Sequence, residues 1–533
     1  MAEAAALSAP VPRDVQYLII GGGLAGLAAA NYLTQNGHHN FLLLEARKRL
    51  GGRVMTLEMG GCPAELGASY VHGILGNPLY KLAIANGLVD VTQAPKPHKV
   101  AAVTEGGKRV PFAVLQEVYE AYYWFFKRCE EYFSCKYKPP EGVQSVGEHV
   151  ELEIGLFLQR FPPDQKRVRR LIFDYLLKRE CCITGCDQMS SVDLVGIGSY
   201  VELPGGNVTL PRGYSSILHP VVRAIPKESI LLGHVVKSIN WNEGDERSSQ
   251  SNASAVNVLC DNGAEFRAQH VICAVPLGVL KAQSDLFSPP LPNVKVEAMK
   301  KLNFGVVNKI FLEWDAPFLT PEISEVILLW ETIDETRISL KDRWYRKLYS
   351  FCKVSEVLFV SWISGDEARF MESLNVKEIA DTCLKILRKF LNDPSVPKPK
   401  SCIYTAWNTQ AFSRGSYTSI GVGGQQMDIE TLSSPLLAPG SEGKKPVVAF
   451  AGEHCHSTFY STGHGAFLSG LTAAQQVSSY NDCSVGVSLS RQSNPDMKTA
   501  SISDLSSLLG NLDVSGNPNS RGKRDDGGFP TPR

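Results

Sequence analysis

A glycine-rich turn close to the amino end limits what this chain can fold into more than any other feature. Residues 17–20 are apolar, Gly21, Gly23 and Gly26 follow, and residues 24–36 form a small-residue segment typical of a helix. In such a strand–turn–helix unit, the first glycine permits a tight turn, the second lets a pyrophosphate approach the backbone, and the third lets the helix pack on the strand. The helix then directs its unpaired N–H groups and its positive dipole end toward the phosphates. The pattern predicts a Rossmann-type dinucleotide site.

An acidic residue stands where such a site needs one. Residues 41–44 predict a second apolar strand, and Glu45 follows it, 24 residues after Gly21. A carboxylate at this position can accept hydrogen bonds from both ribose hydroxyls, and it would repel the extra phosphate of NADP. Glycine turns also occur where two backbones merely pack closely. The strand, the helix and the acidic residue together favour a dinucleotide site.

The residues after Glu45 resemble a known family. Arg47, Gly51, Gly52 and Arg53 lie in the stretch EARKRLGGRV, which resembles the second glycine motif of the FAD-containing amine oxidases. In that family the motif continues the phosphate-binding surface, and its arginine reaches the pyrophosphate. The resemblance implies that the cofactor is FAD and not NAD.

A second stretch narrows the resemblance to one branch of that family. Residues 65–80, ELGASYVHGILGNPLY, are similar to the flavin-facing loop of the polyamine oxidases, the group of spermine oxidase and acetylpolyamine oxidase. The resemblance implies an active-site role for His72, although a histidine in a turn is by itself more often structural or solvated. The residues to which it assigns flavin contact are Leu66, Gly67, Ala68 and Ser69.

Two charged residues in the middle of the chain match positions of the family's active site. Residues 304–312 predict an apolar strand that Lys309 interrupts. The resemblance implies that this lysine holds a water near the hydride-accepting nitrogen and assists reoxidation by dioxygen; a lysine on an exposed edge strand is the structural alternative. Glu180, in KRECCITG, falls where the family carries an acid near the substrate amine. A surface charge on a helix is the alternative for Glu180.

The remaining candidates lie toward the carboxyl end. Tyr417 matches one wall of the family's aromatic substrate cage. Ser416 stands where monoamine oxidases carry the cysteine that bonds to FAD, so the resemblance implies non-covalent FAD. Thr462 replaces the second cage tyrosine, which opens the cage toward a long aliphatic amine. The other positions that the resemblance assigns to the flavin are Val236, Gly452, Glu453, Thr462 and Gly463.

Composition argues against several classes of function. The chain has 533 residues, enough for two domains, and a formal net charge of +0, which disfavours nucleic acid as a partner. Its 13 cysteines form no CxxC pair, so no metal site is expected. We find no signal peptide and no apolar run of about 18 residues, so no membrane span is expected. Residues 531–533 are not a peroxisomal tripeptide, and the expected location is cytoplasmic.

The order of the motifs predicts the two-domain architecture of the amine oxidases, an α/β FAD-binding domain of Rossmann type with an interleaved α+β substrate-binding domain. The segments expected for the FAD-binding domain are 14–95, 205–300 and 440–480, and those expected for the substrate-binding domain are 96–204 and 301–439. The remaining expectations are a flexible start at 1–13, a polar surface loop at 242–255 and a disordered tail at 481–533.

The resemblance implies an FAD-dependent polyamine oxidase; its oligomeric state stays open, with a monomer favoured. Hydride passes from the carbon beside a secondary amine to the flavin, water releases an aldehyde and a shorter amine, and dioxygen reoxidises the flavin to give hydrogen peroxide. The choice between spermine and acetylated spermine or spermidine stays open. One alternative is another FAD-dependent amine or amino-acid oxidase; the latter would need a cationic residue for the carboxylate, and no arginine in the site motifs is expected to serve. The other alternative is a non-catalytic FAD-fold binding protein.

Overall fold

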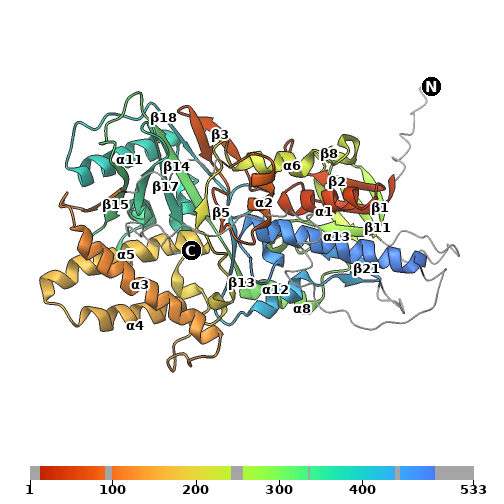
Figure 1. Ribbon diagram of the computed structural model, residues 1–533, viewed down its shortest axis with the longest axis horizontal. Helices are drawn as coiled ribbons and strands as arrows, with labels where there is room; N and C mark the ends of the chain where they lie inside the picture. Colours follow the sequence, from red (N-terminus) through yellow and green to blue (C-terminus); the bar gives the residue numbers. More distant parts are fainter. Residues whose placement is uncertain (1–12, 90–98, 242–255, 334–336, 439–444, 487–533) are drawn as a thin grey trace, which may run out of the picture.

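In a computed structural model of the chain, two β-sheets occupy the two halves of the molecule, and helices cover their faces (Figure 1). The structure describes residues 13–89, 99–241, 256–333, 337–438 and 445–486. The expectations for residues 1–12, 242–255 and 487–533 therefore lie outside the described residues.

The first sheet is built on the predicted strand–turn–helix unit. Its strands are β1 (Arg13–Ile20), β2 (Phe41–Glu45), β8 (Ile230–Leu232), β9 (Val236–Asn240), β10 (Val256–Cys260), β11 (Glu265–Cys273), β12 (Phe287–Ser288), β20 (Leu436–Leu437) and β21 (Pro446–Phe450). In the described part of the chain they form one nine-stranded sheet, in the order β12–β9–β10–β11–β1–β2–β8, with β21 beside β11 and β20 beside β21. β1 lies between β11 and β2, and both run parallel to it. A strand in this position is covered on both faces, which is why residues 17–20 are all apolar.

Alternate residues of β1 pack into two different layers. Tyr17 and Ile19 contact α1 (Leu24–Gln35) and α13 (Gly463–Gly486) on one face. Leu18 and Ile20 face the opposite layer. The helices of that opposite layer are α7 (Leu277–Ala282), α8 (Asn293–Lys301) and α12 (Gln426–Ser433). Two shorter helices, α2 (Pro78–Ala85) and α6 (Leu218–Val222), pack beside α1 and α13. The glycine turn that ends β1 is therefore held between two helical layers.

The second sheet supplies the other wall of the site. Its strands are β6 (Lys99–Thr104), β14 (Val307–Glu313), β15 (Ile323–Leu329), β16 (Ser350–Lys353), β17 (Leu358–Ser364) and β18 (Ser401–Tyr404). Their order is β18–β14–β17–β16–β15–β6, and all neighbours are antiparallel except β15 and β6. β14 lies in the interior of this sheet, so Lys309 is not on an edge strand.

Helices cover the second sheet on both faces. α11 (Val376–Leu391) packs on one face, together with α10 (Gly365–Met371) and the neighbouring α9 (Leu340–Arg343). The helices on the other face are α3 (Phe112–Phe133), α4 (Val146–Leu158) and α5 (Pro163–Thr184) (Figure 1). Val307, Ile327 and Leu329 belong to that second face, and strand alternation places Lys309 and Glu325 on it too.

Three short strand pairs tie distant segments together. The pairs are β3 (Thr56–Met59) with β4 (Cys62–Glu65), β5 (Val71–His72) with β7 (Asn207–Val208), and β13 (Leu302–Gly305) with β19 (Tyr417–Ile420). The β5–β7 pair places His72 opposite Asn207. The β13–β19 pair places Tyr417 opposite Gly305, the last residue of β13.

The structure differs from the sequence analysis in three boundaries. The single strand expected over residues 304–312 is two strands, because β13 pairs with β19 whereas β14 pairs with β17 and β18. The segment from α12 to β20 packs on the first sheet, so that sheet's last contribution begins before residue 440. α13 continues to Gly486, beyond the residue at which the tail was expected to begin.

Candidate active site

A cavity of about 650 Å³ lies between the glycine turn of the first sheet and the second sheet. Two predicted residues, Gly26 and Glu180, are not part of its lining. The predicted residues that line it are Gly21, Gly23, Glu45, Arg47, Gly52, Arg53, Leu66, Gly67, Ala68, Ser69, His72, Val236, Lys309, Tyr417, Gly452, Glu453, Thr462 and Gly463.

The glycine turn has the form that close approach of a phosphate requires. A Cβ on Gly26 would lie 1.9 Å from the carbonyl oxygen of Gly21, so Gly26 serves the contact between α1 and the end of β1. A Cβ on Gly23 would meet nothing within 4 Å, because Gly23 borders the cavity. α1 has no side-chain cap at Gly23, so its first N–H groups remain available to an anion. These features fit the pyrophosphate of FAD.

Glu45 is held rigidly beside this turn. Its Oε2 accepts a hydrogen bond from the backbone N–H of Gly22, and its Oε1 accepts one from the backbone N–H of Arg47, both at 2.7 Å. The residue is 4% exposed and borders the cavity. Each carboxylate oxygen keeps a further lone pair, which is what two ribose hydroxyls require.

Arg47 joins the turn to a segment that the sequence analysis missed. Its Nη2 donates to Ser413 Oγ at 3.0 Å, and its guanidinium carbon lies 5.4 Å from the centre of the Phe412 ring. Burial lowers the pKa of Arg47, while the charge of Glu45 opposes that shift. Ser413 and Phe412 line the cavity, as does the predicted residue Val236 at the start of β9.

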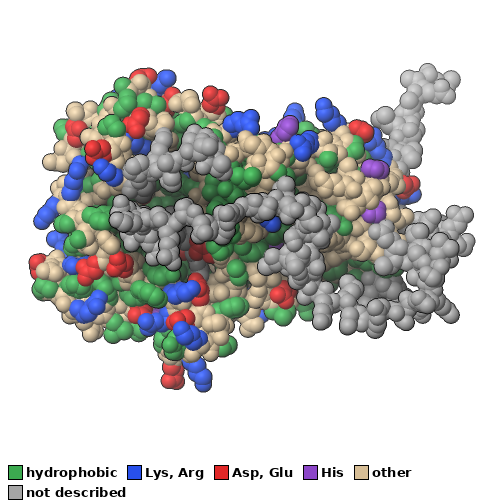
Figure 2. All heavy atoms as spheres, viewed as in Figure 1, with side chains coloured by type: hydrophobic (Ala, Val, Ile, Leu, Met, Phe, Trp, Pro, Cys, Tyr) green, Lys and Arg blue, Asp and Glu red, His purple; other side chains and the backbone are tan. Residues whose placement is uncertain are grey.

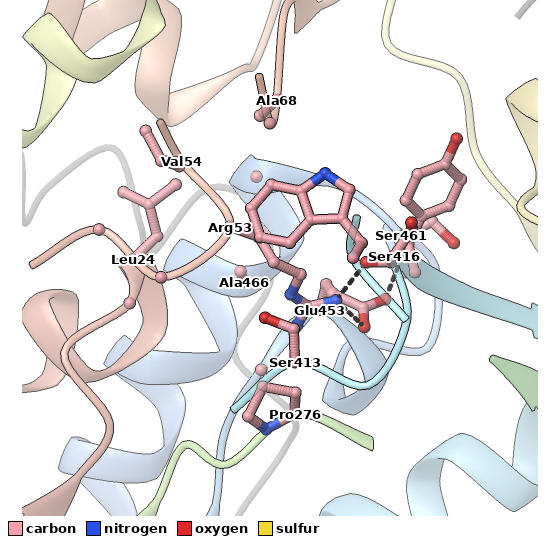
Figure 3. A pocket seen from close by; sticks show the side chains of 18 of the residues that line it. Leu24, Arg53, Val54, Ala68, Pro276, Ser413, Ser416, Glu453, Ser461 and Ala466 are labelled. Carbon is pink, nitrogen blue, oxygen red and sulfur yellow. Dashed lines mark hydrogen bonds and ion pairs between the residues drawn. The ribbon is translucent and has the colours of Figure 1, made fainter. Parts of the chain in front are cut away.

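Arg53 and Glu453 form an ion pair across the cavity wall (Figure 3). Arg53 Nη1 lies 3.0 Å from Glu453 Oε1 and also donates to the carbonyl oxygen of Ser416 at 2.6 Å. Glu453 accepts further hydrogen bonds from Thr418 Oγ1 and from the backbone N–H of Ser461, both at 3.0 Å. The second glycine motif and the carboxyl-terminal segment are thereby fixed to each other.

Lys309 reaches from β14 to the loop predicted to face the flavin. Its Nζ donates to the carbonyl oxygens of Glu65 and Gly67, both at 2.6 Å, and to Ser69 Oγ at 2.5 Å. The side chain is buried among residues that line the cavity. Burial lowers the pKa of Lys309 to about 7, and the charge of Glu65 partly opposes the shift. Lys309 is therefore a cation that can lose its charge close to neutral pH.

His72 is oriented by its neighbour across the β5–β7 pair. Its Nδ1 lies 2.9 Å from Asn207 Oδ1, and because a carbonyl oxygen only accepts, Nδ1 carries the proton and Nε2 is left as an acceptor. Burial lowers the pKa of His72, with the hydrogen bond to Asn207 opposing the shift. The ring also lies 6.2 Å from that of Tyr70. A neutral imidazole with a free acceptor suits a substrate N–H.

Tyr417 packs against the carboxyl-terminal end of α5. Its hydroxyl donates to the carbonyl oxygen of Cys182, and its ring fills the space beside Gly185, where a Cβ would lie 2.4 Å from the ring. Gly185 has φ +72°, so glycine is needed there on two counts. The neighbouring Ser416 hydroxyl donates to the carbonyl oxygen of Val307 and accepts from its N–H, both at 2.9 Å.

Thr462 caps the helix that begins beside the cavity. Its Oγ1 accepts a hydrogen bond from the backbone N–H of Gly465 at 2.9 Å and donates to the carbonyl oxygen of Phe459 at 2.6 Å. α13 begins at Gly463, which lines the cavity. Gly452, with φ +143°, lies two residues after the end of β21 and lines the cavity too. The helix therefore presents its amino-terminal end, where the dipole favours negative charge, to the site.

Glu180 does not line the cavity. It is 4% exposed, Thr184 Oγ1 donates to it at 3.3 Å, and its charge acts on Tyr122 in α3. Its neighbour in sequence, Arg179, lines the cavity instead. Cys182 and Ile183 of α5 line the cavity together with Arg179, whereas Glu180 does not. The position of Glu180 does not support the predicted contact with the substrate amine.

The sequence analysis missed several residues that line the cavity. These are Arg179, Glu325, Tyr349, Trp362 and Trp407. Arg179 thus borders the cavity, whereas the sequence analysis expected no arginine of the site motifs to serve a substrate carboxylate. A partial signal was present, because Tyr175, Arg179 and Ile183 recur every fourth residue on one face of α5. No local pattern relates Arg179 to Glu325.

The fold and the site define a flavoprotein oxidoreductase. A family model described as flavin containing amine oxidoreductase matches residues 24–478, and the chain belongs to this family. It is an FAD-dependent oxidoreductase that acts on amines, and the predicted fold class, cofactor and family are confirmed.

Curated relatives confirm the predicted resemblance to the polyamine oxidase branch. The chain is 33% identical to the human peroxisomal N(1)-acetyl-spermine/spermidine oxidase, over 87% of this chain and 95% of that protein. It is 28% identical to probable polyamine oxidase 5 of Arabidopsis thaliana, over 88% of this chain and 99% of that protein. A solved structure of a putrescine oxidase triple mutant matches with a TM-score of 0.64 at 18% identity, over 88% of this chain and 100% of that one, which shows the common fold.

Two further observations concern the surface and the helices. Positive and negative side chains are intermixed over the face shown in Figure 2, in keeping with the formal net charge of +0. Among the residues that the structure describes, none of the helices combines the length and the apolar character that crossing a membrane requires.

Proposed function

We propose that this protein oxidises polyamines at the carbon beside a secondary amine. The balanced reaction is R–CH₂–NH–R′ + O₂ + H₂O → R–CHO + H₂N–R′ + H₂O₂. The observation that carries the proposal is the buried Lys309, whose ammonium is bonded to the flavin-facing loop inside a cavity that also holds His72 and Tyr417. The names of the human and plant relatives support the substrate class.

The cavity favours the reactive form of the amine. A protonated amine lacks the electron pair that supports hydride loss, and an apolar aromatic site disfavours a charged amine by desolvation. Tyr417 and Trp362 provide ring surfaces, and Nε2 of His72 is placed to accept a hydrogen bond from a substrate N–H. In this proposal His72 and Tyr417 bind and align the amine, and neither acts as an obligatory base.

FAD, when bound, supplies a two-electron acceptor that dioxygen regenerates. In the proposal, Lys309 in its charged form stabilises the negative charge that develops as dioxygen is reduced. The amino-terminal end of α13 at Gly463 provides a second positive potential at the cavity. Non-covalent FAD is part of the same proposal, because the hydroxyl of Ser416 is occupied by the backbone of Val307.

The decisive experiment mixes the FAD-loaded protein with single amines under anaerobic conditions and follows flavin absorbance. Spermine, N1-acetylspermine, spermidine and tyramine are tested in turn. We expect at least one polyamine to bleach the flavin more than tenfold faster than tyramine. Bleaching by tyramine alone would contradict the polyamine assignment, and no bleaching by any amine would favour the binding protein.

One alternative has a specific observation in its favour. Arg179, which lines the cavity, is the kind of residue that an amino-acid oxidase uses for a carboxylate. Glu325 lines the same end of the cavity and would repel a carboxylate there, so we rank this function second. Reduction of the flavin by an L- or D-amino acid, with no response to polyamines, would reverse the ranking.

A cytoplasmic monomer remains part of the proposal. The formal net charge of +0 supports a protein that does not bind to charged membrane surfaces, whereas the human relative is named peroxisomal. Fractionation of cells that express the full chain, and light scattering of the purified protein, test the two predictions.

A further inference from the structure

The carboxyl-terminal turn of α5 brings two cysteine side chains together. α5 ends at Thr184, and Gly185 follows in the left-handed conformation, with φ +72°. The backbone N–H groups of Gly185 and Cys186 both donate to the carbonyl oxygen of Cys181, at 3.0 and 3.1 Å. In a helix that ends in this way, the side chain after the glycine packs on the side chain five residues before it. Here that contact joins the thiols of Cys186 and Cys181, which hydrogen-bond to each other.

The geometry of this turn permits a disulfide between the two residues. A disulfide needs Cα atoms about 4.4 to 6.8 Å apart. The backbone hydrogen bond from Cys186 to Cys181 measures 3.1 Å, and standard bond lengths on either side of it keep the two Cα atoms within roughly 6.5 Å. Both side chains are buried, so neither thiol points into solvent. In the structure both residues are free thiols.

Lys347 and a backbone N–H group surround the pair. Lys347 ends the short helical turn Trp344–Lys347, is partly buried, and donates from Nζ to the carbonyl oxygen of Asp187 at 3.0 Å. Asp187 directly follows Cys186, and the charge of Lys347 acts on both thiols. The sulfur of Cys181 also accepts a hydrogen bond from the backbone N–H of Met189. A cation and N–H donors around a thiol favour its negatively charged form.

These surroundings make Cys181 the more acidic of the two thiols. The hydrogen bond from Cys186 lowers the pKa of Cys181, and the charge of Lys347 adds to this shift. Burial and the charge of Glu180 oppose the shift. The pKa of Cys186 is raised instead, by its hydrogen bond to Cys181 and by burial. Since the thiolate is the nucleophile, Cys181 is suited to attack an oxidant and Cys186 to attack the product of that step.

The pair lies directly behind the wall of the cavity. Cys182 and Ile183, the two residues that follow Cys181, line the cavity. Cys182 is the poorer nucleophile, because burial raises the pKa of its thiol to about 12. Hydrogen peroxide that forms in the cavity therefore arises next to the turn that holds Cys181.

We propose that Cys181 and Cys186 are a modification site at which hydrogen peroxide produces a disulfide. The thiolate of Cys181 attacks one peroxide oxygen and breaks the O–O bond, which gives a sulfenic acid and hydroxide. The thiol of Cys186 then attacks the sulfenic sulfur, so that the S–S bond forms and water leaves. The sum is 2 R–SH + H₂O₂ → R–S–S–R + 2 H₂O; the sulfurs are oxidised and the peroxide is reduced. The inference goes beyond the proposed function and rests on it only for the source of the peroxide.

The same turn holds a residue of the site in place. The hydroxyl of Tyr417 donates to the carbonyl oxygen of Cys182, and its ring packs against Gly185. On the other side, a Cβ on Gly305 would lie 2.0 Å from the carbonyl oxygen of Gly185, so the turn is closely packed. A disulfide holds its sulfurs at about 2.05 Å, closer than two thiols in contact, and its formation draws Cys186 toward α5. The disulfide should therefore displace Tyr417 and slow the oxidation of the amine.

Peptide mass spectrometry of the FAD-loaded protein, after treatment with added hydrogen peroxide, tests the inference. The three cysteines of the turn share one tryptic peptide, residues 180–212. We expect this peptide to lose two hydrogens. Alkylation under denaturing conditions without reduction should then label Cys182 and leave Cys181 and Cys186 unlabelled. Cys135, which is exposed, reports that the peroxide has reacted with the protein.

Three variants identify the residues that take part. In Cys186→Ala no disulfide should form, and a sulfenic-acid reagent should trap Cys181 instead. Lys347→Met should slow disulfide formation roughly tenfold, because the cation that favours the thiolate is lost. Cys129→Ala is the matched control, since Cys129 is buried in the same hydrophobic core as the pair; it should form the disulfide at the rate of the parent.

Activity measurements test the effect of the disulfide on the site. The peroxide-treated parent should oxidise its amine roughly threefold more slowly or worse, because Tyr417 is displaced, and dithiothreitol should restore the rate. Cys186→Ala should show no such reversible loss. An unchanged rate in protein that carries the disulfide would overturn the effect on Tyr417.

Other outcomes would overturn the inference as a whole. One is recovery of Cys181 and Cys186 as alkylated thiols at a peroxide dose that oxidises Cys135. Another is addition of oxygen without a disulfide, either at Cys182 or at Met189, whose sulfur lies 3.6 Å from that of Cys186. Absence of flavin reduction by every polyamine would overturn the proposed function alone, because the peroxide in this experiment is added from outside.

Discussion

Lys309 Nζ lies 2.6 Å from the carbonyl oxygen of Gly67, a residue 242 positions earlier in the chain. The same nitrogen donates to Glu65 and Ser69, so all three donors of the charged ammonium end on one loop. Lys309 thus ties the second sheet to the loop of residues 65–69, which also packs on that sheet through Leu66. Lys309 therefore positions that loop as well as supplying a charge.

Replacing Lys309 by methionine should separate the two halves of the reaction. We expect the Lys309→Met variant to react with dioxygen about a hundredfold more slowly, because a charge next to the developing negative charge is lost. Flavin reduction by substrate should change much less. Stopped-flow measurement of each half-reaction checks this, with the surface variant Lys300→Met as control. Equal rates of reaction with dioxygen in Lys309→Met and the parent would contradict the role of Lys309 in flavin reoxidation.

The oxidative half-reaction should depend on pH through Lys309. Burial lowers the pKa of Lys309 to about 7, so the side chain is charged below that pH and neutral above it. We therefore expect the rate with dioxygen to fall as the pH rises through about 7. The measurement is the second-order reoxidation rate between pH 6 and about 9. The profile of Lys309→Met should be flat over that range, and a matching slope in the variant would assign the titration to another group.

Substitution of His72 should impair catalysis more than cofactor binding. In His72→Ala the acceptor for the substrate N–H is lost, and we expect kcat/KM for the amine to fall at least tenfold while the ratio of FAD to protein stays near that of the parent. Asn207→Ala should act in the same direction but more weakly, since Asn207 orients the ring through Nδ1. Recovery of His72→Ala as apoprotein would make the residue structural.

Loss of the charge on Glu453 should weaken cofactor retention. Glu453→Gln removes the counter-charge of Arg53 in a buried setting, where breaking an ion pair costs about 3 kcal/mol or more. We expect purified Glu453→Gln to carry less FAD and to melt at lower temperature than the parent. Glu297→Gln, which breaks the exposed pair with Lys300, provides the control and should change neither property.

Two glycines of the turn should respond differently to alanine. A Cβ on Gly26 would lie 1.9 Å from a backbone oxygen, so Gly26→Ala should destabilise the fold by about 2 kcal/mol or more. A Cβ on Gly23 would meet no protein atom within 4 Å and would enter the space proposed for the pyrophosphate. Gly23→Ala should therefore fold but bind FAD weakly. Thermal melting of the apoprotein and FAD titration distinguish the two, and similar stability of both variants would contradict this assignment.

Features that depend on adjacent residues were predictable from the sequence. The glycine turn and the position of Glu45 each follow from spacing within a short segment. The resemblance added Lys309 and Glu453, and both line the cavity. The resemblance also implied a role for Glu180. In the structure the preceding residue of α5, Arg179, lines the cavity and Glu180 does not.

The sequence by itself determined a dinucleotide fold, its glycine motifs and the family of the chain, because these are local patterns of apolar residues and glycines. Only the tertiary structure brought Arg179 of α5 and Glu325 of β15 to one cavity, and Lys309 to the loop that holds Gly67. Such pairs depend on how strands register and on which face of a helix meets a sheet. Neither strand register nor the orientation of a helix face can be read from a single sequence when the two residues lie more than a hundred positions apart. The set of charged groups that Arg179 and Glu325 bring to the cavity is therefore known only from the tertiary structure.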